Sequence, residues 1–257
     1  MRFASLGSGS RGNATLVERG DTLLMVDCGF SCVEAERRLQ RLGRSAAQLS
    51  AILVTHEHAD HIGGVARLAR RHRIPVWMSA GTAAMHRDGE LPEQHGFNGH
   101  ESFAIGELEI HPFPVPHDAR EPCQFVFSDG AQRLGILTDA GSVTEHMVRS
   151  LDGCDALLLE CNHDPHMLAT GPYSPCLKAR VGGRLGHLSN PQAAELLARL
   201  DSRRLQHLVA AHLSDKNNTP ELARQALQAV TGGGDDGLCV ADQAQGFAWR
   251  ELVVSGL

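Results

Sequence analysis

The sequence predicts a mixed α/β fold in which sheets are covered by helices, within a single domain of residues 1–257. Short apolar runs typical of strands recur along the chain, and stretches with helical spacing lie between some of them. No linker rich in proline, serine or charge divides the 257 residues. This length lies within the range of one large domain.

The expected strands are short and mostly apolar. Residues 14–17 and 22–26 flank a turn at Gly20 and Asp21, and the continuous apolar run 51–55 fits a buried central strand. The later expected strands cover residues 108–110, 123–127, 135–138, 156–159 and 208–211.

The expected helices become more regular in the second half of the chain. They cover residues 33–42, 64–72, 191–200 and 221–230. The third follows Ser189 and Asn190, which are good N-caps. The fourth follows Thr219 and Pro220, a cap and a first-turn proline.

Composition excludes several classes of protein. Apolar residues make up 42% and charged residues 21%, which is a globular composition, and the net charge of −6 argues against a nucleic-acid coat protein. Seven cysteines without a C-x-x-C pair disfavour a disulfide framework or a zinc ribbon. Without a signal-like N-terminus or a long apolar run, we expect a cytoplasmic protein that does not span a membrane. Oligomeric state stays open.

A glycine-rich segment near the N-terminus matches a dinucleotide-binding pattern that we reject. Residues 7–12 satisfy G-x-G-x-x-G, but that pattern requires a following helix, and residues 13–17 have the pattern of a strand. Two interpretations remain. The segment is a plain hairpin turn, or a turn whose Ser8 and Asn13 side chains face a nearby site.

The strongest chemical signal is a cluster of potential metal ligands directly after the apolar run 51–55. The sequence His56-x-His58-x-Asp60-His61 places four candidate ligands within six residues. Two histidines at i and i+2 in a loop can chelate one ion, and Asp60 with His61 indicates a second ion beside it.

This motif resembles the signature of the metallo-β-lactamase fold superfamily. The resemblance implies an αββα four-layer sandwich with a dinuclear site at one edge of the two sheets. It implies that Asp139 bridges the ions and that Asp27 orients the histidine loop. The implied ligands are His56, His58 and His117 for one ion, and Asp60, His61 and His212 for the other. Two such ions can share a hydroxide that acts as the nucleophile. Zinc and manganese suit these ligands, and iron is possible.

Further motifs resemble the YycJ/WalJ family of this superfamily. They are residues 6–14, 117–122, 160–164, 186–190 and 212–218. The resemblance implies a metal-dependent phosphodiesterase, a nuclease that acts on DNA ends in the 5′-to-3′ direction.

Two residues also resemble a proton-donating pair in the tRNA 3′-processing enzymes. There, a histidine matching His187 protonates the leaving group, and an acidic residue matching Glu160 is its partner. With Asp60 they form the expected catalytic set. Each has a structural alternative, a helix contact for His187 and a buried paired carboxylate for Glu160. His163 either contacts a substrate phosphate or packs its loop. Lys178, Arg180 and Arg184 form a basic stretch that either binds phosphate or is a solvated face, and Lys178 is included in the expected site.

Two other functions remain open from the sequence. One is a metal-dependent hydrolase of a small acyl or thioester substrate, which would not need a proton donor for a poor leaving group. The other is a non-catalytic metal-binding regulatory protein, which the full ligand set disfavours because a structural site leaves no position open.

Overall fold

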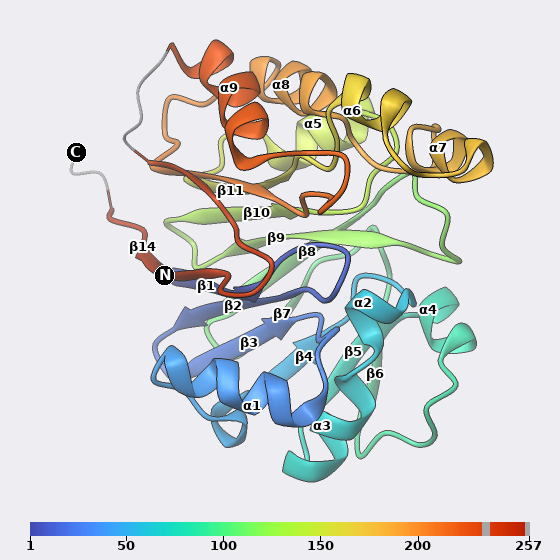
Figure 1. The fold of residues 1–257 in the computed structure, drawn as a ribbon. Helices are drawn as coiled ribbons and strands as arrows, with labels where there is room; N and C mark the ends of the chain where they lie inside the picture. Colours follow the sequence, from blue (N-terminus) through green and yellow to red (C-terminus); the bar gives the residue numbers. More distant parts are fainter. Residues whose placement is uncertain (233–236, 255–257) are drawn as a thin grey trace.

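Two β-sheets pack face to face and carry helices on both outer faces, as the computed structural model shows (Figure 1). The structure describes residues 1–232 and 237–254. The four layers confirm the α/β class and the αββα sandwich expected from the sequence. Within the described residues, no helix is both long and apolar enough to cross a membrane.

Each sheet has seven strands among the described residues. The first runs in the order β14 (Phe247–Glu251), β1 (Arg2–Gly7), β2 (Ala14–Arg19), β3 (Thr22–Val26), β4 (Ala51–Leu53), β5 (Val76–Ser79) and β6 (Gln94–Phe97). The second runs in the order β13 (Leu238–Val240), β12 (His207–Ala211), β11 (Ala156–Glu160), β10 (Arg133–Leu137), β9 (Cys123–Ser128), β8 (Leu108–Pro114) and β7 (Phe103–Ile105).

The helices divide between the two outer faces and the loops at one edge. On the side of the first sheet lie α1 (Cys32–Arg41), α2 (Ala59–Ile62), α3 (Val65–His72) and α4 (Ala80–Met85), with a 3₁₀ turn at Ala46–Gln48. On the side of the second sheet lie α5 (Glu145–Leu151), α6 (Pro165–Thr170), α7 (Pro175–Val181), α8 (Asn190–Ala198) and α9 (Pro220–Thr231).

Three apolar clusters hold the layers together. The central one lies between the sheets and includes the fully buried Phe3 and Phe125. The second packs α1 and α3 on the first sheet through Leu39 and Leu68, and the third packs α8 on the second sheet through Leu196. Burying each such side chain contributes about 1.5–3 kcal/mol.

All the strands and helices expected from the sequence are present, with shifts at their ends. The run 51–55 forms a strand only as far as Leu53, because the backbone N–H of Thr55 leaves the ladder to bond Asp27 Oδ1 at 2.8 Å. The glycine-rich segment joins two antiparallel strands, which confirms that it opens no helix.

Three strands end at residues with left-handed backbone. Asp27, Asp139 and His212 follow β3, β10 and β12 closely, with φ of 61°, 58° and 54°. Such a conformation costs a residue with a side chain about 1–3 kcal/mol and clusters at functional sites. Among the described non-glycine residues, Arg73 at the end of α3 is the fourth with positive φ. β3 and β4 are parallel in the first sheet, and β10, β11 and β12 are parallel in the second. The carboxyl ends of these strands lie at one edge of the sandwich.

Candidate metal centre

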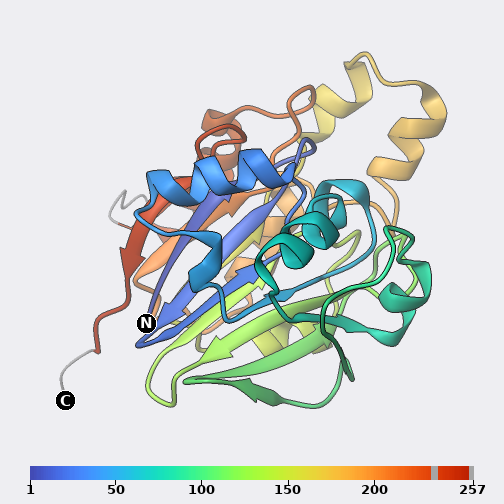
Figure 2. The same ribbon diagram turned by 90° about the horizontal axis from the view of Figure 1, so that it is seen from below.

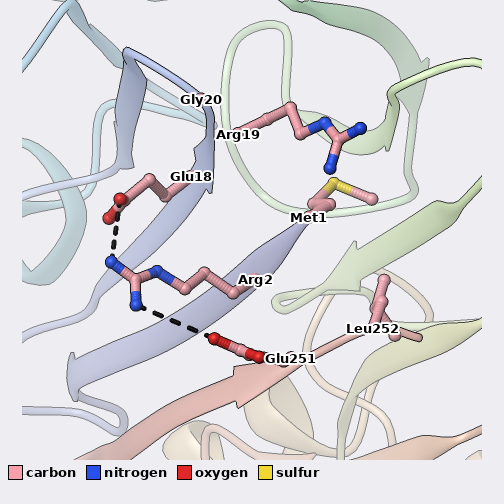
Figure 3. A pocket seen from close by; sticks show the side chains of 7 residues that line it. All are labelled: Met1, Arg2, Glu18, Arg19, Gly20, Glu251 and Leu252. Carbon is pink, nitrogen blue, oxygen red and sulfur yellow. Dashed lines mark hydrogen bonds and ion pairs between the residues drawn. The ribbon is translucent and has the colours of Figure 1, made fainter.

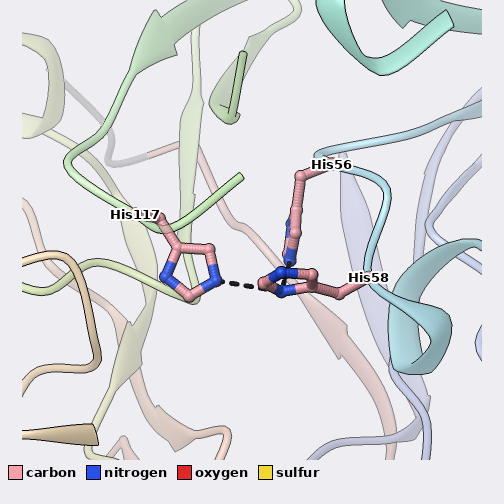
Figure 4. A group of neighbouring side chains, drawn as sticks. All are labelled: His56, His58 and His117. Carbon is pink, nitrogen blue, oxygen red and sulfur yellow. Dashed lines mark hydrogen bonds between the residues drawn. The ribbon is translucent and has the colours of Figure 1, made fainter. Parts of the chain in front are cut away.

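Three histidines converge at this edge (Figure 4). His56 and His58 lie in the loop between β4 and α2, and His117 lies in the loop between β8 and β9. His58 Nδ1 is 3.0 Å from His56 Nε2 and 3.2 Å from His117 Nε2. Ligands at about 2.0–2.1 Å from a tetrahedral zinc ion stand roughly 3.3–3.4 Å apart. The three nitrogens therefore have nearly the spacing of ligands to one ion.

A second group lies beside the first. Asp60 and His61 come from α2, and His212 follows β12. Asp60 Oδ2 lies 3.6 Å from His61 Nε2 and 3.7 Å from His212 Nε2. The side chains of His61 and His212 are at most 2% exposed, whereas Asp60 is 26% exposed. A carboxylate is therefore open to solvent above two buried imidazoles.

Asp139 stands between the two groups. Its Oδ2 is 2.9 Å from His61 Nε2, and its Oδ1 is 3.0 Å from His212 Nδ1 and 3.9 Å from His117 Nε2. One carboxylate therefore reaches both groups. All seven ligands expected from the sequence come together, and candidate ligand atoms within each group lie within 4.8 Å of one another.

The protonation of the cluster favours metal binding. Burial lowers the pKa of His56 and of His117, so both rings are neutral and carry a free lone pair. Burial also opposes the charged forms of Asp139 and His61. The charges of His212 and His61 outweigh burial at Asp139 and hold its pKa well below its usual range, and the charges of Asp139 and Asp27 raise the pKa of His61. Without a metal ion, protonated histidines neutralise the Asp139 carboxylate. A divalent cation would replace those protons.

The donor set fits a divalent transition metal. Imidazole nitrogens and carboxylate oxygens suit zinc, manganese and iron. Among the described residues, Asp139 Oδ2 and His212 Nδ1 are buried and make no hydrogen bond of normal geometry, although each lies about 3 Å from an oppositely charged group. Buried polar atoms without a well-formed hydrogen bond are rare and require an explanation, which an ion between these atoms provides.

Side chains behind the cluster fix the orientation of the histidines. Asp27 Oδ2 lies 2.8 Å from His61 Nδ1 and accepts a bond from Thr55 Oγ1, so His61 presents Nε2 to the cluster. Gly186 O lies 2.9 Å from His117 Nδ1 and leaves Nε2 of that ring for the cluster. Such partners set the tautomer and orientation of metal-binding histidines.

The glycine-rich loop between β1 and β2 holds the backbone of two expected ligands. Ser8 Oγ accepts a bond from His212 N at 2.8 Å, and Asn13 Nδ2 donates to Asp60 O at 3.3 Å. The Asn13 amide also lies 3.1 Å from His61 Nε2. The structure therefore brings Ser8 and Asn13 to the site, where they contact expected ligands.

Glu160 and His187 form a pair beside Asp139. Glu160 ends β11, and its Oε1 lies 2.8 Å from His187 Nδ1 while its Oε2 accepts bonds from Ala140 N and Leu188 N. Burial opposes protonation of His187, but the charge and hydrogen bond of Glu160 outweigh it, so the pKa of His187 is raised. The His187 ring is 22% exposed, so it is accessible from solvent.

The cluster opens into a cavity of about 340 Å³. Its walls include Asp60, His187 and His212, together with Arg180 of the expected basic stretch and Asp118, which was not expected at the site. Arg180 Nε donates to Asp118 Oδ2 at 2.5 Å, and Asp118 Oδ1 lies 3.5 Å from His117 Nε2. The position of Asp118 directly after His117 is a sequence signal that could have indicated it.

Two of the expected substrate residues do not line this cavity. Lys178 Nζ donates to Ala169 O at 2.7 Å, and His163 is buried with Nδ1 unpaired among the described residues. Their contact with substrate stays a prediction.

Another cavity, of about 270 Å³, lies at the opposite end of the β1–β2 hairpin (Figure 3). Arg2 crosses it to pair with Glu18 and Glu251, at 2.9 and 3.9 Å. None of its lining residues is a histidine or cysteine, so we place the chemistry at the other edge.

Known proteins resemble this chain over most of its length. Residues 22–212 match the family model of the beta-lactamase superfamily domain. The chain is 36% identical over 234 residues to exodeoxyribonuclease YycJ of Bacillus anthracis, covering 90% of this chain and 89% of that protein. It is 35% identical over 233 residues to exodeoxyribonuclease WalJ of Streptococcus pneumoniae, covering 88% and 87%.

A solved structure shows the same fold. The metallo-beta-lactamase fold protein YhfI from Bacillus subtilis superposes with a TM-score of 0.75 over 97% of this chain and 98% of that chain. The two sequences are 18% identical, so this likeness concerns the fold alone.

Proposed function

The chain belongs to the beta-lactamase superfamily and, within it, to the YycJ/WalJ family, and we propose from this premise that it is a metal-dependent exodeoxyribonuclease. The chemistry is hydrolysis of a phosphodiester. The proposed substrate is a DNA end, and the proposed direction is 5′ to 3′, as the resemblance to the family implies.

The seven clustered side chains are proposed to hold two divalent ions, zinc or manganese. His56, His58 and His117 would bind one, Asp60, His61 and His212 the other, with Asp139 shared between them. When bound, such ions polarise phosphoryl oxygens and lower the pKa of a water molecule toward neutrality. The protein's own contribution is to fix the ligands, through Asp27 behind His61 and Gly186 behind His117.

His187 is proposed to protonate the oxygen that leaves. A nucleoside alkoxide is a poor leaving group, so its departure requires a proton donor. Glu160 raises the pKa of His187, and two backbone N–H groups that donate to Glu160 fix its carboxylate in place. The Asp60 carboxylate, exposed at the cavity wall, completes the proposed catalytic set.

The observation that carries the proposal is the Glu160–His187 pair at 2.8 Å, directly beside the clustered ligands. A thioester hydrolase has a thiolate leaving group that departs without protonation and would not require this pair. A regulatory metal protein would not require the open cavity into which His187 is exposed.

A substrate screen with the purified protein tests the proposal. The protein, stripped of metal and reloaded with zinc or manganese, is incubated with 5′- and 3′-labelled DNA, the matching RNA, and a thioester. We expect metal-dependent release of nucleotides from the 5′ end of DNA, and two ions per chain by elemental analysis. Hydrolysis of the thioester without any cleavage of nucleic acid would refute the proposal.

A further inference from the structure

The α6–α7 segment (residues 165–181) stands out because it contributes little to the core. Both ribbon views place it at the outer margin of the molecule, beyond the two sheets (Figures 1 and 2). No residue of α7 is buried, and in α6 only Leu168 is. Packing therefore does not explain why the chain forms these two helices here.

The charge of this region is opposite to that of the whole protein. The chain has 30 acidic and 24 basic residues, yet no aspartate or glutamate occurs between Asp164 and Glu195. Lys178, Arg180 and Arg184 lie within that stretch. A local cationic surface on a protein of net charge −6 attracts a polyanion to this place rather than elsewhere.

The C-terminal half of α7 lies at the wall of the cavity beside the clustered ligands. Leu177, Arg180 and Val181 of α7 line the cavity together with His58 and His187. Arg180 is 59% exposed and holds Asp118, the residue that follows His117. The exposed guanidinium group of Arg180 is therefore a cation at the wall of this cavity.

Two more cations extend the surface outward. Lys178 donates one of its three ammonium protons to Ala169 O in α6, so two protons remain available at the junction of the two helices. Arg184 is exposed in the loop after α7, where its backbone O accepts a bond from Ser142 Oγ. The backbone at Arg184 is thereby fixed while its side chain faces solvent.

The size of the cavity determines whether a single strand or a duplex can reach the clustered ligands. A volume of about 340 Å³ with buried ligands at its base admits one nucleotide and excludes a duplex. The strand that reaches the cluster is therefore single, and its remaining nucleotides must lie on the surface outside. Single strands bind along cationic tracks beside aromatic rings, and Tyr173, the one tyrosine of the chain, lies partly exposed between α6 and α7.

We propose that the α6–α7 segment, with Arg184, is a binding arm for single-stranded DNA. Its cations hold the backbone phosphates of the strand whose end occupies the metal cavity. This proposal rests on the proposed nuclease function and adds to it the path of the strand outside the site.

Binding measurements separate this proposal from the catalytic one. Fluorescence anisotropy of a labelled 12-nucleotide strand compares the wild type with Lys178→Gln/Arg184→Gln. Arg180 is left unchanged because it lines the cavity. A matched control, Arg67→Gln/Arg149→Gln, removes two exposed cations from α3 and α5. A second variant, Lys178→Arg/Arg184→Lys, keeps both charges, and thermal melts verify that all variants are folded.

We expect the arm variant to weaken binding of the 12-nucleotide strand on the order of tenfold, because two phosphate contacts are lost. The slope of log K against log salt should fall by about 1.4, at roughly 0.7 per contact on single strands. The charge-keeping variant should bind like the wild type, and a dinucleotide should bind both proteins equally.

Two results would overturn the arm. One is equal binding of the long strand by the wild type and the arm variant, and the other is an equal loss in the control variant. A wild type that binds the strand through these cations without cutting it would refute the nuclease function and leave the arm supported.

Discussion

Replacing His187 should affect substrates according to how well their leaving groups depart. The His187→Ala variant removes the donor that Glu160 holds at 2.8 Å. A nucleoside alkoxide needs that proton, whereas p-nitrophenolate leaves without it. General acid catalysis contributes about 10²–10⁴-fold, or roughly 2.7–5.4 kcal/mol of barrier. DNA cleavage should fall by this factor, and hydrolysis of bis-p-nitrophenyl phosphate should change little.

The structure also predicts what this variant keeps. His187 is not one of the seven proposed ligands, and its Nδ1 is bonded to Glu160, so metal content should equal that of the wild type. Steady-state kcat/KM on both substrates, with elemental analysis, makes the comparison. His100→Ala, at an exposed loop position, is the matched control. Equal losses on the two substrates would refute the role of proton donor, and loss of metal would mean that His187 is a ligand.

Three further outcomes follow from the same geometry. Asp139→Ala should lose at least one metal ion per chain and most activity, as measured by elemental analysis; two ions still bound would contradict its shared position. Asp27→Ala should weaken metal binding about 10–100-fold, since His61 loses its orienting partner, and a competition titration with a chelator measures this. At pH 8, a thiol reagent should modify exposed Cys176 first, because burial raises the pKa of Cys123 to about 12 and of Cys154 to about 11. Modification of Cys123 or Cys154 at the rate of Cys176 in the native protein would contradict their burial.

The local part of the site could be predicted because its ligands are close in sequence. His56, His58, Asp60 and His61 come from one loop and one short helix, so their spacing alone indicated metal binding. The distant ligands could be placed because each follows an apolar strand. Parallel strands present their carboxyl ends at one edge, which brings Asp139 and His212 to the same place.

Side-chain direction was the part that the sequence could not supply. Lys178 and Arg180 belong to one basic stretch, and only Lys178 was included in the expected site. Residues two apart on a helix point roughly 200° apart, so the two side chains cannot share a wall. In the structure Arg180 lines the cavity and Lys178 turns to α6. Because the sequence did not predict helix α7, the helical positions of Lys178 and Arg180 could not be used to tell which of them faces the cavity.

The backbone strain at the strand ends links the fold to the chemistry. Asp27, Asp139 and His212 each adopt a left-handed conformation that L-residues avoid. In each case the side chain turns from the strand direction into the cluster, where it meets His61 or Asp139 within about 3 Å. Extended backbone would carry these side chains along the sheet face instead. The apolar clusters on both sides of each sheet stabilise the strands that hold these strained ends. The sandwich can therefore keep seven polar side chains at ligand spacing even where the local backbone opposes it.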